Sequence, residues 1–327
     1  MIYDDVIYGR VEIDEPIVLE IMNSPEMRRL KGVDQAGYFE PYFPGSSHFR
    51  FEHSVGVYLL LKKFGAALEE QIAGLIHDIS HGVFSHCLDY IFDEGNQKEQ
   101  NHQDNIFEDF LRNTTIPNIL EKYGLNLNYI LDDSRHPLKE NNLPDICADR
   151  IDYSLRDAFH YDNISIEKIN NILNHLKVID NIWMFDNLEI AKEYSNLFLR
   201  MNEIYRSGME SAIMFQTVGD LFKYAWKVGY VQRDDFYTTD QKILEKMKQY
   251  LDKDEKLSFY RQRMNNIIKC KNNPDDFDAH IFLKSRFVDP FWDNNGKLLR
   301  LSDVDNQWKE NIKNKYKAKE YFLKFER

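Results

Sequence analysis

Cysteine is scarce in this chain of 327 residues, and long apolar runs and blocks of basic residues are absent. The three cysteines, at positions 87, 147 and 270, are odd in number and form no C-x-x-C pair. A disulfide framework is therefore not expected, and a reducing compartment is. No segment approaches the roughly 18 apolar residues of a membrane span, and no basic-then-apolar leader is visible. We therefore expect a cytoplasmic protein without a membrane partner.

The balance of charge is acidic, since 42 Lys and Arg residues against 54 Asp and Glu residues give a formal net charge of −12. Nucleic acid is therefore not expected as a partner, because binding to its phosphate backbone selects for basic surfaces. A local basic pocket for a phosphorylated small molecule is compatible with the same balance. Hydrophobic residues make up 43% of the chain, which is enough for a sizeable core.

The spacing of apolar residues predicts a mainly α fold. Segments with helical spacing are 50–65, 66–79, 102–112, 145–161 and 187–229, the last with a break near Gly208. A polar loop is expected over 93–101, between two of these helices. The segment 2–13, rich in β-branched and aromatic residues around Gly9, predicts a small hairpin. No internal repeat is present in the sequence.

The pattern of residues changes beyond about residue 240. A charged helical stretch is followed by HIFLKSRFVDPFW and KLLRLSDVD, which alternate like two strands, and by a Lys-rich helix ending in YFLKF. We therefore predict two domains. The first, over 1–235, is a helical body with its core at 48–165, and the second, over 236–327, is a small helical and α+β appendage.

Histidines and carboxylates are concentrated between Arg50 and Asp89, which hold four of the ten histidines. Imidazole and carboxylate form the mixed ligand set that divalent Zn, Mn, Fe or Ni accepts. The four candidates to bind one metal ion are His53, His77, Asp78 and a distant Asp149. His77 and Asp78 are adjacent and point about 100° apart on a helix, so they share a metal only at a helix end. Open coordination positions would favour a catalytic metal over a structural one.

The predicted helix over 145–161 carries a polar face. Asp149, Tyr153, Arg156 and Asp157 lie at positions i, i+4, i+7 and i+8, and Arg150 flanks them. A metal-binding carboxylate, a phenol and basic groups on one side suit a sugar and a phosphate chain. The alternative interpretation is a solvated helix with ion pairs between neighbouring turns.

Basic side chains near the predicted metal site are candidates to bind phosphate, because Arg offers forked donors to phosphate oxygens. These candidates are Arg50, His81, Arg150 and His102. Asp89 and His102 also suit a carboxylate–imidazole pair, in which the carboxylate raises the pKa of the imidazole so that it can donate a proton. We interpret His86 as structural.

Several segments resemble one known family. They are R-F-E-H-S-V-G-V, G-L-I-H-D-I-S-H-G-V-F-S-H, A-D-R-I-D-Y-S-L-R-D and the upstream R-L-K-G-V-D-Q-A-G-Y-F-E-P-Y-F-P-G-S-S-H. Together they resemble the HD-domain phosphohydrolases, and more narrowly the deoxynucleoside triphosphate (dNTP) triphosphohydrolases that include the mammalian SAM-and-HD-domain protein and its bacterial relatives. The resemblance runs from about residue 5 to 230, and K-S-R-F-V-D-P at 284–290 is similar to the C-terminal part of that family.

The resemblance implies an activity and a role for each matching residue. Family members cleave dNTPs to deoxynucleoside and inorganic triphosphate, by attack of a metal-activated water at the α-phosphorus. The implied metal ligands, for Mn, Fe, Zn, Ni or Mg, are His53, His77, Asp78 and Asp149. The implied triphosphate contacts are Arg50, His81, Arg150 and Tyr153. Gln35 and Asp157 would face the sugar, and His102, oriented by Asp89, would protonate the leaving 5′-oxygen. A dNTP substrate and a homo-oligomer are the expected partners.

Two departures from the family pattern keep alternatives open. Gln103 stands where many relatives carry Glu beside the catalytic His, and the Y-x-H-K element is replaced here by Tyr205-Arg206-Ser207-Gly208. Arg206 can partly substitute for the missing His and Lys. One alternative is a hydrolase of another nucleotide or phosphoester. The other is a nucleotide-binding regulator without turnover.

Overall fold

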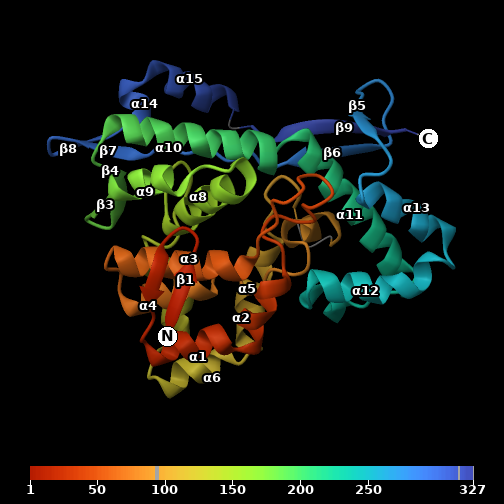
Figure 1. Cartoon of the computed structure of the whole chain (residues 1–327), viewed down its shortest axis with the longest axis horizontal. Helices are drawn as coiled ribbons and strands as arrows, with labels where there is room; N and C mark the ends of the chain where they lie inside the picture. The colour runs from red at the N-terminus through yellow and green to blue at the C-terminus, as the bar shows by residue number, and fades with distance from the viewer. Residues whose placement is uncertain (93–95, 316, 327) are drawn as a thin grey trace.

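Helix α3 (Arg50–Lys63) lies in the middle of a helical body (Figure 1). The computed structural model describes residues 1–92, 96–315 and 317–326. The other α-helices in these ranges are α1 (Pro16–Asn23), α2 (Pro25–Arg29), α4 (Leu68–Ile76), α5 (His102–Arg112), α6 (Ile116–Lys122), α7 (Leu127–Leu131), α8 (Ala148–Asp162), α9 (Ile166–Asn174), α10 (Leu188–Met201), α11 (Met209–Lys227), α12 (Asp240–Leu251), α13 (Glu255–Met264), α14 (Leu301–Val304) and α15 (Asn306–Lys315). Short 3-10 or π turns are η1 (Leu30–Gly32), η2 (Ser85–Tyr90), η3 (Asp133–Arg135), η4 (Asn202–Arg206) and η5 (Arg233–Tyr237).

Three small sheets complete the described fold. Their strands are β1 (Ile2–Asp5), β2 (Gly9–Glu12), β3 (Leu176–Ile179), β4 (Ile182–Phe185), β5 (Cys270–Asn272), β6 (Ala279–Leu283), β7 (Phe291–Asn294), β8 (Lys297–Arg300) and β9 (Lys319–Phe325). The first two strands form the predicted hairpin. One sheet has the order β3-β4-β7-β8, with β4 and β7 parallel, and the other has the antiparallel order β5-β9-β6.

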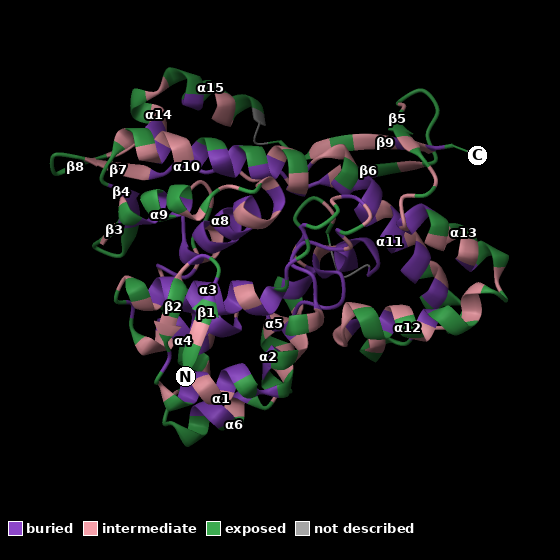
Figure 2. Cartoon of the chain, in the orientation of Figure 1, coloured by how far each residue is buried: buried purple, intermediate pink, exposed green. Residues whose placement is uncertain are grey.

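Helix α3 is buried over most of its length, as the purple ribbon in Figure 2 indicates. It packs between α4 and α8, and its apolar residues Val55, Tyr58 and Leu59 face one hydrophobic cluster while Val57 and Leu60 face another. Polar side chains on such a helix must find partners inside the protein, because an unpaired buried polar group costs free energy. The buried His53 and Arg50 therefore mark the part of the fold where a polar site is built.

Most helix predictions are confirmed, and the fold is mainly α. The segments 50–65, 66–79 and 102–112 contain α3, α4 and α5, and the segment 145–161 contains all of α8 but its last residue, Asp162. The long segment 187–229 contains α10 and α11, separated by the π turn η4 just before Gly208. None of the described helices has the length and apolar character needed to cross a membrane.

Several elements differ from the prediction because distant parts of the chain determine them. The strands β3 and β4 were not expected, and β4 depends on its pairing with β7, more than 100 residues away. The segment YFLKF is the strand β9 rather than the end of a helix, because it lies between β5 and β6. Of the loop predicted over 93–101, residues 93–95 lie outside the described residues.

The segment after residue 235 shares its core with the helical body. Phe84 and Phe222 from the first 235 residues belong to the same hydrophobic cluster as Leu257, Ile281 and Leu323. Helix α11 contacts both α13 and β6, and Figure 1 shows each of them next to α11. The C-terminal strands β6 and β9 therefore pack directly against α11 of the helical body.

Candidate metal-binding active site

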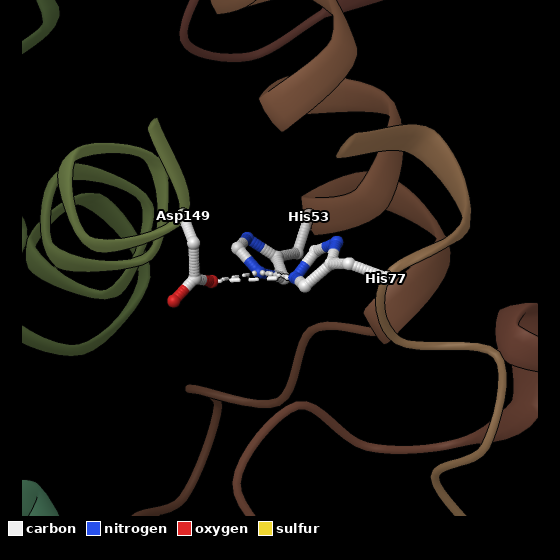
Figure 3. A group of neighbouring side chains, drawn as sticks. All are labelled: His53, His77 and Asp149. Atoms are coloured by element: carbon white, nitrogen blue, oxygen red, sulfur yellow. Dashed lines mark hydrogen bonds and ion pairs between the residues drawn. The ribbon is translucent and has the colours of Figure 1, made fainter. Parts of the chain in front are cut away.

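Two histidines, one from α3 and one from the end of α4, lie next to each other (Figure 3). His53 lies in the first turn of α3, and His77 follows the last residue of α4. Their ring centroids are 5.0 Å apart, and their Nε2 atoms are 3.2 Å apart. Helix α4 ends at Ile76, three residues before the end of the predicted segment 66–79, so His77 and Asp78 both lie at a helix end, as the sharing of one metal requires.

Two carboxylates complete the predicted ligand set. Asp149, in the first turn of α8, places Oδ1 3.0 Å from His53 Nε2 and 3.3 Å from His77 Nε2. Asp78 places Oδ1 3.4 Å from His77 Nε2 and Oδ2 3.7 Å from His53 Nε2. The structure therefore brings together all four residues that the sequence predicted as metal ligands, from α3, α8 and the segment that follows α4.

The hydrogen bonds of the two imidazoles fit a bound cation. His77 Nδ1 lies 2.7 Å from the carbonyl oxygen of Gly74, which can only accept a hydrogen bond, so Nδ1 carries the proton. His53 Nδ1 lies 2.8 Å from Asp152 Oδ1 and is protonated for the same reason. When both rings are neutral, their Nε2 lone pairs face oxygens of Asp149 and Asp78. Acceptors cannot hydrogen-bond to one another, whereas a divalent metal satisfies all of them.

The charge of this site leads to the same conclusion. Burial lowers the pKa of His53, but the hydrogen bonds that Asp149 and Asp152 accept from this imidazole outweigh burial and raise the pKa to about 9. Without a metal, the surplus of carboxylates therefore holds a proton on the imidazole. A metal ion and that proton compete for the same Nε2 lone pair, so metal binding releases a proton.

A buried ionic network behind His53 was not found by the sequence interpretation. Asp152 accepts from His53 on one side and from Arg156 Nη2 (2.9 Å) on the other, and Arg156 Nη1 lies 3.2 Å from Asp5 Oδ2. The three charged side chains are at most 1% exposed. A Cβ at Gly56 would lie 2.1 Å from both Asp152 Oδ2 and Arg156 Nη2, so only glycine fits beside them. The i, i+4 spacing of Asp152 and Arg156 was the available signal.

The metal-ligand cluster opens into a cavity of about 890 Å³. Of the predicted substrate contacts, those that line it are Gln35, Arg50, His81, Arg150 and Tyr153. Tyr153 Oη and Gln35 Oε1 are buried and have no hydrogen-bond partner in the part of the chain that the structure describes. Buried polar atoms of this kind are normally satisfied, so their position on a cavity wall fits a polar ligand.

Asp157 lies elsewhere than predicted. It is fully buried, is not among the residues that line the cavity, and accepts from Arg206 Nε at 2.9 Å. Its Oδ1 is 3.3 Å from His48 Nε2. Eight residues separate Asp157 from Asp149, which corresponds to about 12 Å along the helix and a rotation of about 80°. In place of Asp157, the helix presents Tyr153 to the cavity, with the Arg206 guanidinium carbon 4.0 Å from the centre of its ring.

The predicted pair of Asp89 and His102 also differs from the pair in the structure. Asp89 Oδ1 accepts the backbone N–H of His102 at 2.9 Å, while the His102 imidazole places Nε2 3.1 Å from Tyr237 Oη. His102 is buried against Phe92 and is not among the residues that line the cavity.

His86, interpreted from the sequence as structural, occupies the position expected of His102. It lines the cavity, and its Nδ1 lies 3.7 Å from Asp89 Oδ2. Burial raises the pKa of Asp89 to about 7. The i, i+3 spacing of His86 and Asp89 was the signal that the sequence interpretation missed, because the turn η2 places both side chains on one side.

The cavity wall is also more basic than the sequence suggested. Besides Arg50 and Arg150, the basic residues that line it are Lys139, Arg206, Lys284 and Arg286. Arg206 belongs to the element that departs from the family pattern, and its guanidinium supplies a positive charge there despite the missing His and Lys. The sequence of residues 284–290 is similar to the family, but that similarity implied no role for its basic residues Lys284 and Arg286.

Comparisons with known proteins agree with this geometry. The HD domain family matches residues 50–157, the segment that contains all four metal-ligand candidates. An uncharacterized protein of Bacillus subtilis, YdhJ, is 33% identical over 93% of this chain and 92% of its own length. The metal-dependent phosphohydrolase cns2 of Cordyceps militaris is 30% identical over 70% of this chain and 67% of its own.

A deoxynucleoside triphosphate triphosphohydrolase SAMHD1 homolog from Dictyostelium discoideum is 26% identical over 72% of this chain, which spans half of that protein's length. Among solved structures, a phosphohydrolase from Bacteroides thetaiotaomicron matches the whole of both chains with a TM-score of 0.72 and 18% identity. At that identity the structural likeness shows the fold.

Proposed function

The chain belongs to the HD-domain family of metal-dependent phosphohydrolases, and on that premise we propose that it hydrolyses nucleotides, with a dNTP as the leading substrate. The observation that carries the proposal is the convergence of His53, His77, Asp78 and Asp149 on the wall of a cavity lined by basic side chains. Similarity to a dNTP triphosphohydrolase supports the choice of substrate. The expected products are deoxynucleoside and inorganic triphosphate.

A metal ion held by His53, His77, Asp78 and Asp149 would supply Lewis-acid chemistry to a phosphoryl group and would favour deprotonation of a water nucleophile. Arg50 is held in place to bind the same phosphoryl group. Its Nε donates to Ser85 Oγ at 2.6 Å, its Nη1 to Asp78 Oδ2 at 2.5 Å and its Nη2 to the carbonyl of Gln35 at 2.8 Å. Because guanidinium has five N–H donors, two remain for a phosphate oxygen.

His86 is the proton donor that the geometry favours for the leaving oxygen. It lines the cavity next to His81, with ring centroids 5.1 Å apart, and Asp89 lies behind it. Burial, and then the electrostatic effect of His81 and of the Arg50 guanidinium, hold the pKa of His86 well below its ordinary value. A phosphate ester brings the opposite charge into the cavity and raises this pKa, so the imidazole gains a proton as the substrate binds.

Replacing His86 is therefore expected to slow the reaction more than replacing His102. Loss of a positioned general acid costs about 10²–10⁴-fold in kcat, so His86→Ala should fall in that range. His102→Ala, a change of the same size in a buried imidazole outside the cavity wall, is the matched control and should have a much smaller effect on kcat. Steady-state kinetics of the two variants, with metal content measured in parallel, decides between them. A larger loss in His102→Ala would restore His102 as the donor.

A panel of nucleotides tests the proposed reaction. The purified protein is incubated with Mn²⁺ and each dNTP, and then with the corresponding mono- and diphosphates, and the products are separated by ion-exchange chromatography. We expect deoxynucleoside and inorganic triphosphate in equal amounts from at least one dNTP. Release of only orthophosphate or of a nucleoside monophosphate would reject the triphosphohydrolase activity and favour a hydrolase of another nucleotide or phosphoester.

A regulator without turnover is the second candidate, and the departure at Gln103 is the observation that favours it. Gln103 lines the cavity, and its Nε2 donates to the carbonyl of Gln100 at 3.0 Å, so a neutral amide stands where many relatives carry a carboxylate. For this candidate, the panel would show nucleotide binding by calorimetry and no product. Hydrolysis that is lost on removal of the metal ligand Asp149 would exclude it.

A further inference from the structure

The segment that follows β6 forms one wall of the catalytic cavity. In an extended chain, successive side chains point to opposite sides. Leu283, Ser285 and Phe287 are buried, while Lys284 and Arg286 are half-buried and line the cavity. Because these two residues are two positions apart, the backbone directs both toward the same space.

Hydrogen bonds fix this segment to the helical body. Asn202, the first residue of the π turn η4, accepts the backbone N–H of Arg286 at 2.9 Å through Oδ1 and donates to Ser285 Oγ at 3.2 Å through Nδ2. Tyr90, in η2, donates its hydroxyl to the carbonyl of Phe282 at 2.8 Å. The cationic pair is therefore held in position by two elements that also border the cavity through Arg206 and His86.

The two cations differ from the other basic residues of the cavity. Four lining cations are each paired with a carboxylate: Arg50 with Asp78, Lys139 with Asp133, Arg150 with Glu140 and Arg206 with Asp157. Lys284 Nζ donates to the backbone carbonyl of Glu99 at 2.8 Å, and Arg286 Nη1 donates to Gln100 Oε1 at 3.3 Å. Neither has a carboxylate partner within 4.0 Å in residues 1–92, 96–315 and 317–326. Two positive charges thus face the cavity with only neutral acceptors.

The electrostatic surroundings of the pair also call for an anion. Burial and the charge of Arg286 lower the pKa of Lys284, and burial lowers the pKa of Arg286, which also lies near Arg206. Like charges at close range destabilise each other unless an opposite charge lies between them. A phosphate chain supplies that charge, and guanidinium binds its oxygens in a forked geometry.

Building on the proposed hydrolysis of nucleotides, we propose that Lys284 and Arg286 form an anion subsite that holds the phosphates lying beyond the reacting phosphoryl group. The metal ligands, Arg50 and His81 already account for that reacting group. Two further cations are needed only by a substrate with additional phosphates, such as a nucleoside di- or triphosphate. The C-terminal segment then selects for the length of the phosphate chain.

Kinetics with two substrates tests the subsite. Lys284→Ala, Arg286→Ala and the double variant are compared with Lys297→Ala, which removes an exposed lysine of β8 outside the cavity. A hydrogen bond to a charged group is worth about 1.5–3 kcal/mol, so each variant should lower kcat/KM for the dNTP about tenfold or more. The ratio of kcat/KM for the dNTP to that for the matching monophosphate should fall by a similar factor. An equal loss with both substrates would overturn the subsite.

Binding of inorganic tripolyphosphate separates this inference from the proposed reaction. Isothermal titration with Mg²⁺ in excess should show that the double variant binds tripolyphosphate about 100-fold more weakly than the natural sequence and Lys297→Ala do. That result supports the subsite even if no nucleotide is hydrolysed. Unchanged binding in both single variants would overturn it even if dNTPs are hydrolysed. Thermal unfolding checks the fold of each variant. If Arg286→Ala is unstable, Lys284→Ala provides the test, because within residues 1–92, 96–315 and 317–326 the one hydrogen bond of Lys284 Nζ goes to the Glu99 carbonyl.

Discussion

Asp149→Ala is expected to lower kcat/KM by about 10³-fold or more, because a bound metal supplies several kcal/mol of transition-state stabilisation and about 1.4 kcal/mol corresponds to tenfold. Asp149 Oδ1 contacts the Nε2 atoms of both His53 and His77, so its loss removes a ligand that the two helices cannot replace. Steady-state kinetics with the best nucleotide of the panel, at a fixed excess of Mn²⁺, measures the effect.

A thermal shift shows whether the loss arises from the metal. Mn²⁺ should raise the melting temperature of the natural sequence and leave that of Asp149→Ala unchanged, because only a folded state that binds the ion is stabilised by it. Asp162→Ala is the matched control, since Asp162 lies at the other end of α8 and pairs with Arg200 at the surface. Full activity in Asp149→Ala, or an equal loss in both variants, would contradict the assignment of Asp149 as a ligand.

Arg156→Ala is expected to reduce the free energy of unfolding by about 3–5 kcal/mol, because breaking a buried ion pair leaves uncompensated charge inside the protein. Asp5 and Asp152 would both lose their positive partner, and Arg156 is among the largest fully buried side chains of the chain. Asp152 also orients His53, so metal affinity should fall by about 10–100-fold along with stability. Urea denaturation followed by circular dichroism measures the first effect, and metal titration measures the second.

Arg112→Ala provides the control for that stability loss. Arg112 forms an exposed i, i+4 pair with Glu108 on α5, and exposed pairs contribute little because water and salt screen them. Its unfolding midpoint should stay close to that of the natural sequence. If the unfolding midpoint of Arg156→Ala were also unchanged, the buried network of Asp5, Asp152 and Arg156 would not stabilise the fold around His53.

Local sequence patterns predicted the fold where neighbouring residues determine the structure. The apolar spacing over 50–65 located α3, and the segment 102–112 coincides with α5. The strand β9 was predicted as the end of a helix, since its conformation depends on β5 and β6, whose paired residues lie 36 to 55 positions earlier. Helical and strand propensities decide little in such short segments when long-range pairing competes with them.

The same distinction applies to the site. His53, His77, Asp78 and Asp149 were accessible from residue type and from resemblance, because metal ligation restricts both. The hydrogen-bond partner of Asp89 could not be predicted from the sequence. Asp89 accepts from the backbone N–H of His102, and sequence spacing does not distinguish a backbone partner from a side-chain partner. Arg156 was predicted on the substrate face, yet it is buried behind His53, since the rotation of α8 relative to α3 is set by packing around Gly56.

The position of the metal tests the account most directly. Crystals of the Mn²⁺-loaded protein give an anomalous difference map that locates the ion independently of any activity. We expect one strong peak at about 2.0–2.3 Å from His53 Nε2, His77 Nε2 and oxygens of Asp78 and Asp149, with an open side toward the cavity. A peak held by other residues, or no peak at this cluster in a protein that binds Mn²⁺ in solution, would contradict it.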